Sequence, residues 1–403
     1  MPTAAKKAPL KFRISWSGRA HDYSESEIAA VVEAMKTADP QTQGRFLAKF
    51  EADFAAFTGA KSAFGMTNCT HALELAADLC RLGKGAEVVL PGHTYCASAI
   101  PFGRTGAAIR WADIDPATFL VSLKTVEKAV SAKTKVIVIV HLYGLLNPEI
   151  EKIAAFAKRK GIFLVEDCAQ SFGAKRGGRH AGTFGDFGCY SFHAQKNMTT
   201  MGEGGVLVAA DPAHAKLVPG LRHNGHKPFP DQSEYWLPAM SNVDVDLDGV
   251  WPHNFSMCEA QAALGSALLK RLDALNARRR ERALAFRAAL KGFPELVFQK
   301  IDAPEAHVHH LLPARYDSPR RGSDRDALLR LLSEKYAIKA IVQYYPLYRY
   351  DLFKKMGHGQ AACPETDRFF DSMVSIPAHE WMSDADFAYL TESTLSALRT
   401  LRG

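Results

Sequence analysis

The chain has 403 residues and a mass of 44.2 kDa, with 47% hydrophobic and 23% charged residues. These proportions are typical of a globular protein and exclude a disordered chain, a collagen-like repeat and a coiled coil. The 50 Lys and Arg against 43 Asp and Glu leave a net charge of +7. That excess is compatible with phosphate-bearing small molecules and too weak to indicate nucleic acid binding.

Targeting and redox signals indicate a soluble cytoplasmic protein. The seven cysteines are scattered and form no Cys-x-x-Cys pair, so neither a disulfide framework nor a zinc ribbon is expected. The N-terminal sequence lacks the apolar stretch of a signal peptide. The longest apolar run, Val136 to Leu146, is far shorter than the roughly 20 residues that a membrane-spanning helix needs, so no membrane segment is expected.

The first half of the chain predicts a mainly parallel β-sheet. From about residue 64 to 208, short β-branched segments alternate with helical patterns, which is typical of βαβ units. Helices are predicted over 70–82 and 149–160. Strands are predicted over 88–90, 109–111, 136–140, 162–165, 189–192 and 206–208.

The second half predicts a smaller α/β domain. An Asp-rich stretch, 241–248, leads into a long helical region over 256–290. A strand over 307–314 follows, then a helix over 324–335 with Ser323 as its N-cap, and a last helix over 384–398. We therefore expect a large domain over 1–258 and a small C-terminal domain over 259–403.

Three features of the first half could carry chemistry. Asp167 follows a predicted strand, and ligands of open α/β sheets bind beyond the carboxyl ends of strands. Lys196 lies in a loop between two strands, and the segment Thr67 to His71 starts a helix whose free N–H groups could hold a phosphate. Each alone has an ordinary explanation as a turn residue, a solvated lysine or an N-cap. Together they describe a pyridoxal phosphate site. The Asp167 carboxylate would keep the pyridine nitrogen protonated, and Lys196 would hold the cofactor through an imine bond.

Several longer motifs carry a family resemblance. They are Pro91-Gly-His-Thr-Tyr-Cys-Ala-Ser98, His141-Leu-Tyr-Gly144, Glu166-Asp-Cys-Ala-Gln170 and Ser191-Phe-His-Ala-Gln-Lys196, followed by Gly202-Glu-Gly-Gly205. In this order and spacing the chain resembles the sugar aminotransferases of the DegT/DnrJ/EryC1/StrS family. The resemblance implies the aspartate aminotransferase fold and pyridoxal 5′-phosphate as cofactor.

The resemblance also implies roles for residues around the cofactor ring. Lys196 would be the Schiff-base lysine and the proton shuttle, and Asp167 would pair with the pyridine nitrogen. Gln170 would lie near the 3-hydroxyl of the ring, and Tyr95 would stack on the ring face.

A phosphate site and a shared dimer follow from the same resemblance. The phosphate would lie among Asn68, Cys69, Thr70, His71 and Ser191. Asn254 matches a family residue that reaches the phosphate held by the neighbouring subunit, which implies a two-fold homodimer with shared active sites.

The implied activity is transfer of an amino group from glutamate (or glutamine) to a keto-sugar, above all a nucleotide-linked one, with ping-pong kinetics. Three departures from the family pattern matter. Cys69 replaces a usual Gly, Ser256 replaces a usual Arg that could bind the donor carboxylate, and Tyr348 stands where His is common. The last is closer to enzymes for keto-cyclitols and aminohydroxybenzoate precursors, which are the alternative within the family.

Other readings of the chain are less favoured. A non-catalytic pyridoxal phosphate-binding regulator is an alternative of another class, and a sugar 3-dehydratase would have His in place of Lys196. The segment His307-Val-His-His310 could bind a metal, but no partner carboxylate is evident, so no metal is expected. The arginines of 278–282 are expected on a solvated helix face rather than against nucleic acid, and Gly182-x-x-Gly185-x-x-Gly188 precedes a strand, unlike a dinucleotide loop.

Overall fold

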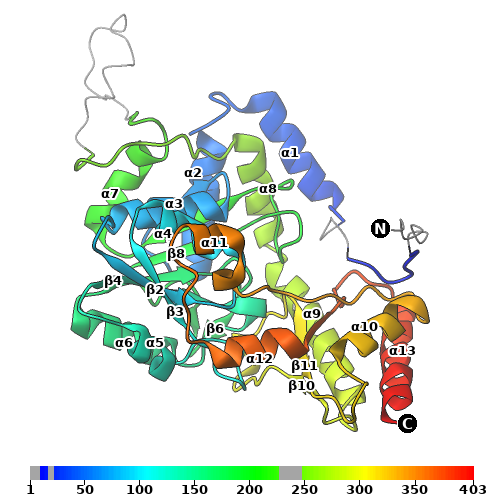
Figure 1. The fold of residues 1–403 in the computed structure, drawn as a ribbon. Coiled ribbons are helices and arrows are strands. Elements are labelled where there is room, and N and C mark those ends of the chain that lie inside the picture. Colours follow the sequence, from blue (N-terminus) through cyan, green and yellow to red (C-terminus); the bar gives the residue numbers. More distant parts are fainter. Residues whose placement is uncertain (1–9, 17–21, 227–246) are drawn as a thin grey trace, which may run out of the picture.

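A central sheet of seven strands organises the chain (Figure 1), which the computed structural model describes over residues 10–16, 22–226 and 247–403. In sheet order the strands are β1 (Ala63–Met66), β9 (Gly205–Ala209), β8 (Phe187–Ser191), β5 (Phe163–Asp167), β4 (Thr134–Val140), β2 (Glu87–Pro91) and β3 (Ala108–Ala112). Strands β8 to β3 are parallel, whereas β9 is antiparallel to both β1 and β8. The expected mainly parallel sheet is confirmed.

Helices surround this sheet, and further helices follow in the C-terminal part of the chain. The first eight are α1 (Glu25–Thr37), α2 (Arg45–Thr58), α3 (Cys69–Leu79), α4 (Ile100–Arg104), α5 (Leu123–Ala129), α6 (Ile150–Lys160), α7 (Pro212–Leu221) and α8 (Glu259–Leu269). The others are α9 (Leu272–Ala289), α10 (Arg325–Glu334), α11 (Asp351–Lys355), α12 (Pro364–Ser372) and α13 (Asp384–Arg402). None of the helices in the described part of the chain is long and apolar enough to cross a membrane.

The sheet forms where the sequence is most apolar and β-branched. The run Val136 to Val140 in β4 is buried throughout, as expected for a central parallel strand covered on both faces. Helix α6 buries Ile150, Ile153 and Phe156 on one face and ends at Gly161, whose left-handed φ of 65° suits a residue without a side chain. These elements hold the carboxyl ends of the parallel strands at one edge of the sheet.

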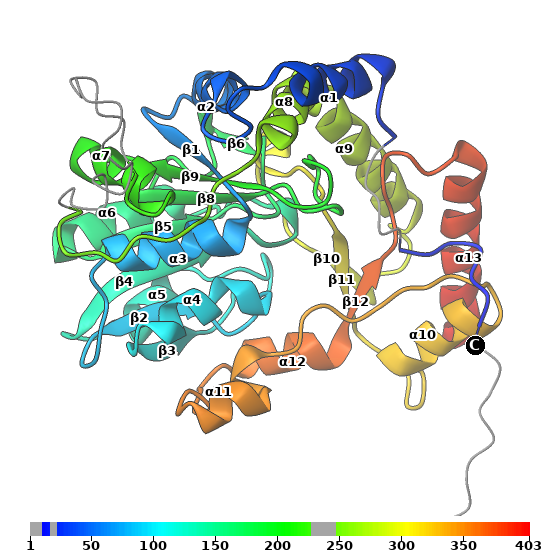
Figure 2. The ribbon, with the colours of Figure 1, turned by 90° about the horizontal axis from the view of Figure 1, so that it is seen from above.

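A second, smaller sheet lies near the C-terminus. It is antiparallel, in the order β10 (Leu296–Phe298), β11 (Leu312–Tyr316) and β12 (Met373–Ile376), and a short hairpin, β6 (Lys175–Arg176) and β7 (Arg179–His180), stands apart from both sheets. Figures 1 and 2 show this sheet beside α10 and α13, at the end of the molecule away from α3, α4 and α7. The small C-terminal sheet is as expected.

Two separate clusters of buried side chains make up the core. The first fills the space around the large sheet, and the second joins the small sheet to α9, α10 and α13 through residues such as Phe286, Leu328 and Leu398. Leu264 and Leu268 of α8 belong to the first cluster. The division into domains 1–258 and 259–403 stays a prediction.

Several predicted element boundaries are wrong. The helical region over 256–290 is two helices, α8 and α9, with a break at residues 270–271, and the helix predicted over 70–82 ends at Leu79. The N-cap of α10 is Asp324, whose carboxylate accepts from the backbone N–H of Ala327, while Ser323 donates to a carbonyl of the preceding turn. The Asp-rich stretch 241–248 lies outside the described residues except for its last two.

The strand predicted over 307–314 is also wrong in its first half. Residues 307–310 are irregular, and β11 starts only at Leu312. His307 and His309 stack on each other with ring centroids 3.9 Å apart, and His309 has a left-handed φ of 48° that breaks an extended strand. The alternation of the histidines at 307 and 309 therefore does not come from a β-strand.

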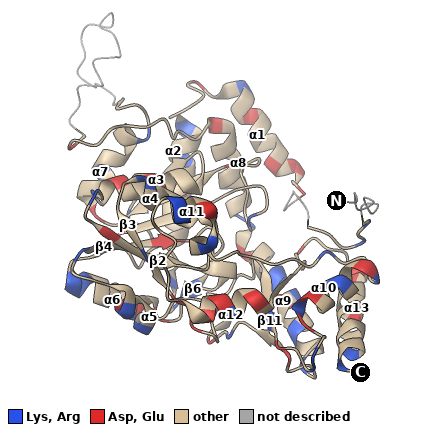
Figure 3. Ribbon diagram, viewed as in Figure 1, with Lys and Arg blue, Asp and Glu red and all other residues tan. Residues whose placement is uncertain are grey.

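The expected solvated face of the arginines of 278–282 is wrong for Arg279 and Arg282, whereas Arg278 is exposed. Arg279 and Arg282 are each only 5% exposed, and Arg279 forms an ion pair of 2.7 Å with the buried Glu380. Arg282 pairs with Asp384 at the start of α13. These arginines tie α9 to the C-terminal region instead of facing solvent. In Figure 3 the acidic residues of α13 lie towards its start and its basic residues at its end, which suits the dipole of a helix.

Buried histidines should make the protein sensitive to acid. Burial lowers the pKa of His93 to about 3, and burial with the charges of Arg287 and Arg280 lowers that of His309 to about 3. Since an unfolded histidine titrates near 6.5, the unfolded chain binds more protons below that pH, and stability falls as pH drops from 6.5 towards 3. The loss is up to about 1.4 kcal/mol per pH unit for each histidine.

Urea denaturation at pH 6.5, 5.5 and 4.5 measures this effect. We expect His309→Asn to reduce the pH dependence of the free energy of unfolding by up to one proton, since Asn tolerates the left-handed backbone and does not titrate. Comparison with wild type cancels the contribution of carboxylates elsewhere. Identical slopes for the two proteins would contradict the assignment.

Candidate active site

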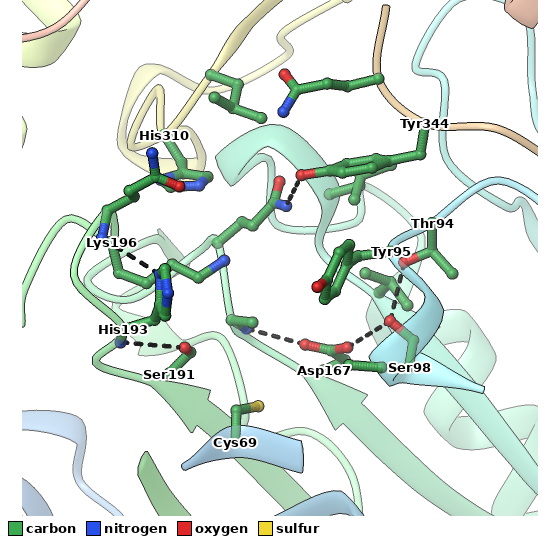
Figure 4. A pocket seen from close by; sticks show the side chains of 18 of the residues that line it. Cys69, Thr94, Tyr95, Ser98, Asp167, Ser191, His193, Lys196, His310 and Tyr344 are labelled. Carbon is green, nitrogen blue, oxygen red and sulfur yellow. Dashed lines mark hydrogen bonds between the residues drawn. The ribbon is translucent and has the colours of Figure 1, made fainter. Parts of the chain in front are cut away.

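A pocket of about 430 Å³ lies at the carboxyl ends of the parallel strands (Figure 4). Val140, Asp167 and Ser191, the last residues of β4, β5 and β8, all line it. This is the edge where ligands bind in open α/β sheets. Of the residues predicted for the site, Asn68, Cys69, Thr70, Tyr95, Asp167, Gln170, Ser191 and Lys196 line this pocket.

Lys196 enters the pocket from the loop between β8 and β9. Its Nζ forms no hydrogen bond or ion pair with any residue in the described ranges, and its side chain lines the pocket (Figure 4). Burial lowers the pKa of the Lys196 amine, while the negative charge of Asp167 acts in the opposite direction. A lysine amine with a lowered pKa and no protein partner is suited to act as a nucleophile and base.

Asp167 is held by two hydrogen bonds. It is the last residue of β5 rather than the residue after it, and only 4% of it is exposed. Its Oδ2 accepts from the Ser98 hydroxyl at 2.7 Å, and its Oδ1 accepts from the backbone N–H of Ala169 at 3.0 Å. Donation to both oxygens fixes the orientation of the carboxylate, which can hold a cationic ring nitrogen in a ligand.

The neighbouring Glu166 is buried on the opposite side of the strand and braces β5. Its carboxylate accepts from the backbone N–H groups of Gly182, Phe184 and Gly185, at 2.9, 2.6 and 2.6 Å. His141 Nε2 lies 2.9 Å from the same carboxylate. The glycine motif of 182–188 is therefore a loop that binds a buried side chain, which accounts for its unusual position before a strand.

The N-terminus of α3 forms the opposite wall. The Asn68 side chain accepts from the backbone N–H of His71 at 2.9 Å, so the N–H groups of Cys69 and Thr70 have no partner within the helix. Gly205 of β9 packs directly beneath them, since a Cβ there would lie 2.7 Å from the Cys69 nitrogen. This wall offers backbone donors and the positive end of a helix dipole to an anion.

Gln170 and two tyrosines shape the upper side of the pocket. The Gln170 amide accepts from the Tyr143 N–H at 2.6 Å and donates to the Tyr344 hydroxyl at 2.9 Å. Tyr344 contacts Tyr95 edge to face, with ring centroids 5.8 Å apart. Tyr95 is 56% exposed despite its size, so its ring is available to a flat ligand.

Two predicted site residues are not brought to this pocket. The His71 ring stacks on Phe255 at 4.0 Å and its backbone N–H is bound by Asn68, so the expected contact of His71 with a phosphate is not supported. Asn254 is exposed and does not line the pocket of its own chain. Its role across a dimer stays a prediction.

Two of the departures from the family pattern also lie outside the pocket. Ser256 Oγ lies 2.9 Å from His223 Nδ1. Tyr348 packs against Gly92, where a Cβ would come within 2.8 Å of its ring, and its hydroxyl binds Asp367. Tyr348 therefore packs against the segment after β2 from outside the pocket. The presence of Tyr instead of His at this position says little about which ligand the pocket binds.

Sequence reasoning missed several residues that line the pocket. Ser98 stood in a quoted motif without a role, Arg279 was expected on a solvated face, and His310 was considered only as a metal ligand. His307 and His310 turn to different partners, Gln299 and Asn197. Trp16 and Trp381 also line the pocket. Nothing in the local sequence singles out these residues, and Ser98 itself lies in a short 3-10 helix, Cys96–Ser98.

Comparison with known proteins shows the family of the chain. The sequence pattern of the DegT/DnrJ/EryC1/StrS aminotransferase family matches residues 21–394. A UDP-N-acetyl-3-dehydro-alpha-D-glucosamine 3-aminotransferase from Acidithiobacillus ferrooxidans is 31% identical over 335 residues, 83% of each chain.

Solved structures share the fold over nearly the whole chain. The PLP form of a putative sugar aminotransferase from Streptococcus pneumoniae has a TM-score of 0.82 at 25% identity, covering 98% of this chain and 99% of that one. A 3-amino-5-hydroxybenzoic acid synthase has a TM-score of 0.81 at 28% identity, covering 97% and 100%. The expected fold is confirmed, and the expected cofactor is the one named for the pneumococcal structure. The chain belongs to the DegT/DnrJ/EryC1/StrS aminotransferase family and is an aminotransferase.

Proposed function

We propose that this protein uses pyridoxal phosphate to transfer an amino group from glutamate, or glutamine, to a keto-sugar, with nucleotide-linked keto-sugars as the first candidates. The observation that carries the proposal is the presence of the unpartnered Lys196 amine and the buried Asp167 carboxylate in one pocket. The similarity to an enzyme named for a UDP-linked keto-sugar supports the acceptor class.

The residues of the pocket fit pyridoxal phosphate. The free N–H groups at the start of α3 and the Ser191 hydroxyl suit its phosphate, and Tyr95 suits the face of its ring. The Asp167 carboxylate suits a protonated ring nitrogen, and the Gln170 amide suits the ring hydroxyl. When bound, the cofactor supplies an electron sink for the negative charge that develops at the carbon losing a proton.

The chain's own groups then do the proton transfer and the orientation. With its lowered pKa, the Lys196 amine would remove a proton from the α-carbon of the donor in the first half-reaction, and in the second it would deliver a proton to the carbon that becomes aminated. Ser98 and Ala169 fix the orientation of the Asp167 carboxylate, which would face the positive charge of the bound cofactor. Because the amino group would stay on the enzyme after the first product leaves, the two half-reactions predict ping-pong kinetics.

A second candidate is amination of a keto-cyclitol or an aminohydroxybenzoate precursor. It is favoured by the likeness to a 3-amino-5-hydroxybenzoic acid synthase, which is as extensive as the likeness to the sugar enzymes. Trp16 and Trp381 also suit the apolar face of an unsubstituted ring as well as that of a sugar. The homodimer with Asn254 at the partner's site stays part of the proposal for either acceptor.

An acceptor screen on the holoenzyme tests the proposal. Glutamate and glutamine are offered first, with the change in cofactor absorbance recorded in a single turnover. UDP-linked and dTDP-linked keto-hexoses and a keto-inositol are then offered to the aminated enzyme. We expect glutamate to change the absorbance and a nucleotide-linked keto-hexose to restore it.

The other outcomes separate the alternatives. Restoration by the keto-inositol alone would favour the second candidate. If no donor changes the absorbance of a fully loaded protein, it is a cofactor-binding protein without turnover and the proposal fails.

A further inference from the structure

His310 lines the pocket beside Lys196 but belongs to the irregular segment before β11 (Figure 4). Its ring is buried, and its Nδ1 lies 3.0 Å from Oδ1 of Asn197, the residue after Lys196. Its other nitrogen, Nε2, forms no hydrogen bond with any residue of the described ranges. The direction of the Nδ1 bond decides which nitrogen carries the proton.

A chain of buried amides fixes that direction. The Asn276 amide nitrogen lies 3.0 Å from the Phe172 carbonyl, which can only accept, so the Asn276 oxygen faces Asn197. The Asn197 nitrogen must then donate to that oxygen, at 2.8 Å, and it also donates to the Val308 carbonyl at 3.1 Å. Two backbone carbonyls therefore orient both amides in the same sense.

The side-chain oxygen of Asn197 determines which nitrogen of His310 carries the proton. With its nitrogen committed, Asn197 presents its oxygen to the ring, and His310 Nδ1 must donate. Nε2 is then left with a lone pair. Burial and the charges of Lys196 and Arg279 lower the pKa of His310 well below its usual value, so the ring stays neutral.

The hydrogen-bonded chain Asn276–Asn197–His310, called the relay below, has little conformational freedom. Asn197 and Asn276 are each 3% exposed, and they join the Lys196 loop to α9. Gly173 makes room for the second amide, because a Cβ there would lie 2.5 Å from the Asn276 nitrogen. Reversal of either amide would leave two donors or two acceptors facing each other in a buried site, which costs about 1–3 kcal/mol for each unsatisfied group.

We propose that His310 is a specificity-determining residue whose bare Nε2 accepts a hydrogen bond from a hydroxyl of the ketone acceptor, with Asn197 and Asn276 as positioning residues that fix its tautomer. The inference rests on the proposed function, since a polyhydroxy ketone supplies the O–H that Nε2 needs. The ionised carboxylates of glutamate can only accept hydrogen bonds, and its amino group is the reacting group, so this donor has no spare hydrogen-bond donor for Nε2. A change at His310 should therefore slow the half-reaction with the ketone acceptor and not the half-reaction with the amino donor.

Three substitutions test the contact. In His310→Asn the amide reaches only the position of Nδ1, in His310→Gln it reaches that of Nε2, and His309→Asn is the matched control outside the pocket. The acceptor is whichever of the UDP-linked or dTDP-linked keto-hexoses or the keto-inositol the wild type uses. We expect His310→Asn to lower kcat/KM for that acceptor about tenfold to a hundredfold.

The donor half-reaction and the conservative variant distinguish this role from a structural one. We expect the single-turnover rate with glutamate to stay within about threefold of wild type in all three variants, and His310→Gln to keep most of the acceptor kcat/KM. Equal losses in both half-reactions, or equal losses in His310→Asn and His310→Gln, would overturn the proposal.

The tautomer can be measured without any substrate. Ring-nitrogen NMR of ¹⁵N-histidine protein, with His310→Gln to assign the signal, should show a neutral His310 protonated at Nδ1. In Asn276→Ala, where the Asn197 nitrogen keeps only its bond to the Val308 carbonyl, that preference should weaken. A wild-type ring protonated at Nε2 would refute the relay even if the enzyme aminates ketones, whereas an enzyme inactive on every ketone refutes the proposed function alone.

Discussion

Replacement of Lys196 by Ala is expected to remove transamination while the protein still binds pyridoxal phosphate. The phosphate wall at α3 and the Asp167 carboxylate are independent of the lysine, so the cofactor keeps its contacts. The lost proton transfer alone lowers a rate by roughly 10²- to 10⁴-fold. The readout is the single-turnover rate with glutamate, together with the cofactor retained after gel filtration.

The matched control is Lys216→Ala, which removes an exposed lysine of α7. It should leave the rate unchanged. Borohydride reduction of the wild-type holoenzyme, followed by peptide mapping, should trap the cofactor on the peptide that contains Lys196. An active Lys196→Ala enzyme, or a label on another lysine, would defeat the mechanism.

The volume-preserving Lys196→Met separates chemistry from stability. Because burial lowers the pKa of Lys196, the folded protein pays a penalty for the charged amine at every pH below the usual lysine pKa. We therefore expect cofactor-free Lys196→Met to unfold at a temperature no lower than wild type. The activity loss then cannot be attributed to misfolding.

Asp167→Asn is expected to be the next most damaging change. The amide keeps the size of the side chain but not its charge, so a cationic ring nitrogen loses its buried counterion. Loss of one preorganised electrostatic group in a dry site lowers kcat by about 10²- to 10³-fold. The measurement is kcat with glutamate at saturating cofactor, with the bound cofactor confirmed by absorbance.

Two further variants serve as comparisons for Asp167→Asn. Ser98→Ala removes one donor to the carboxylate but not its charge, and a smaller loss of about tenfold is expected. Asp302→Asn breaks a surface pair with Arg176 and should have no effect on kcat. If Asp167→Asn were as active as the surface variant, the carboxylate would have no part in the reaction.

The sequence predicted the groups that act directly and most of the large sheet. Lys196, Asp167 and the start of α3 each lie next to a strongly apolar, β-branched or capped segment, so local pattern places them at strand ends or a helix N-terminus. The same local reasoning failed at residues 307–310, since alternating histidines look like a strand until the left-handed backbone of His309 is known. It failed again for Arg279, because a buried ion pair needs the distant Glu380.

The amino-acid sequence by itself determined the family, the positions of most strands along the chain and the presence of a lysine and an acid in one site, because each of these is written in contiguous motifs. Only the tertiary structure decided which side chains support them. Ser98 reaches Asp167 across 69 positions of sequence, and Asn197 reaches His310 across 113. Hydrogen-bond direction and burial depend on groups brought together by folding, and no local pattern encodes them.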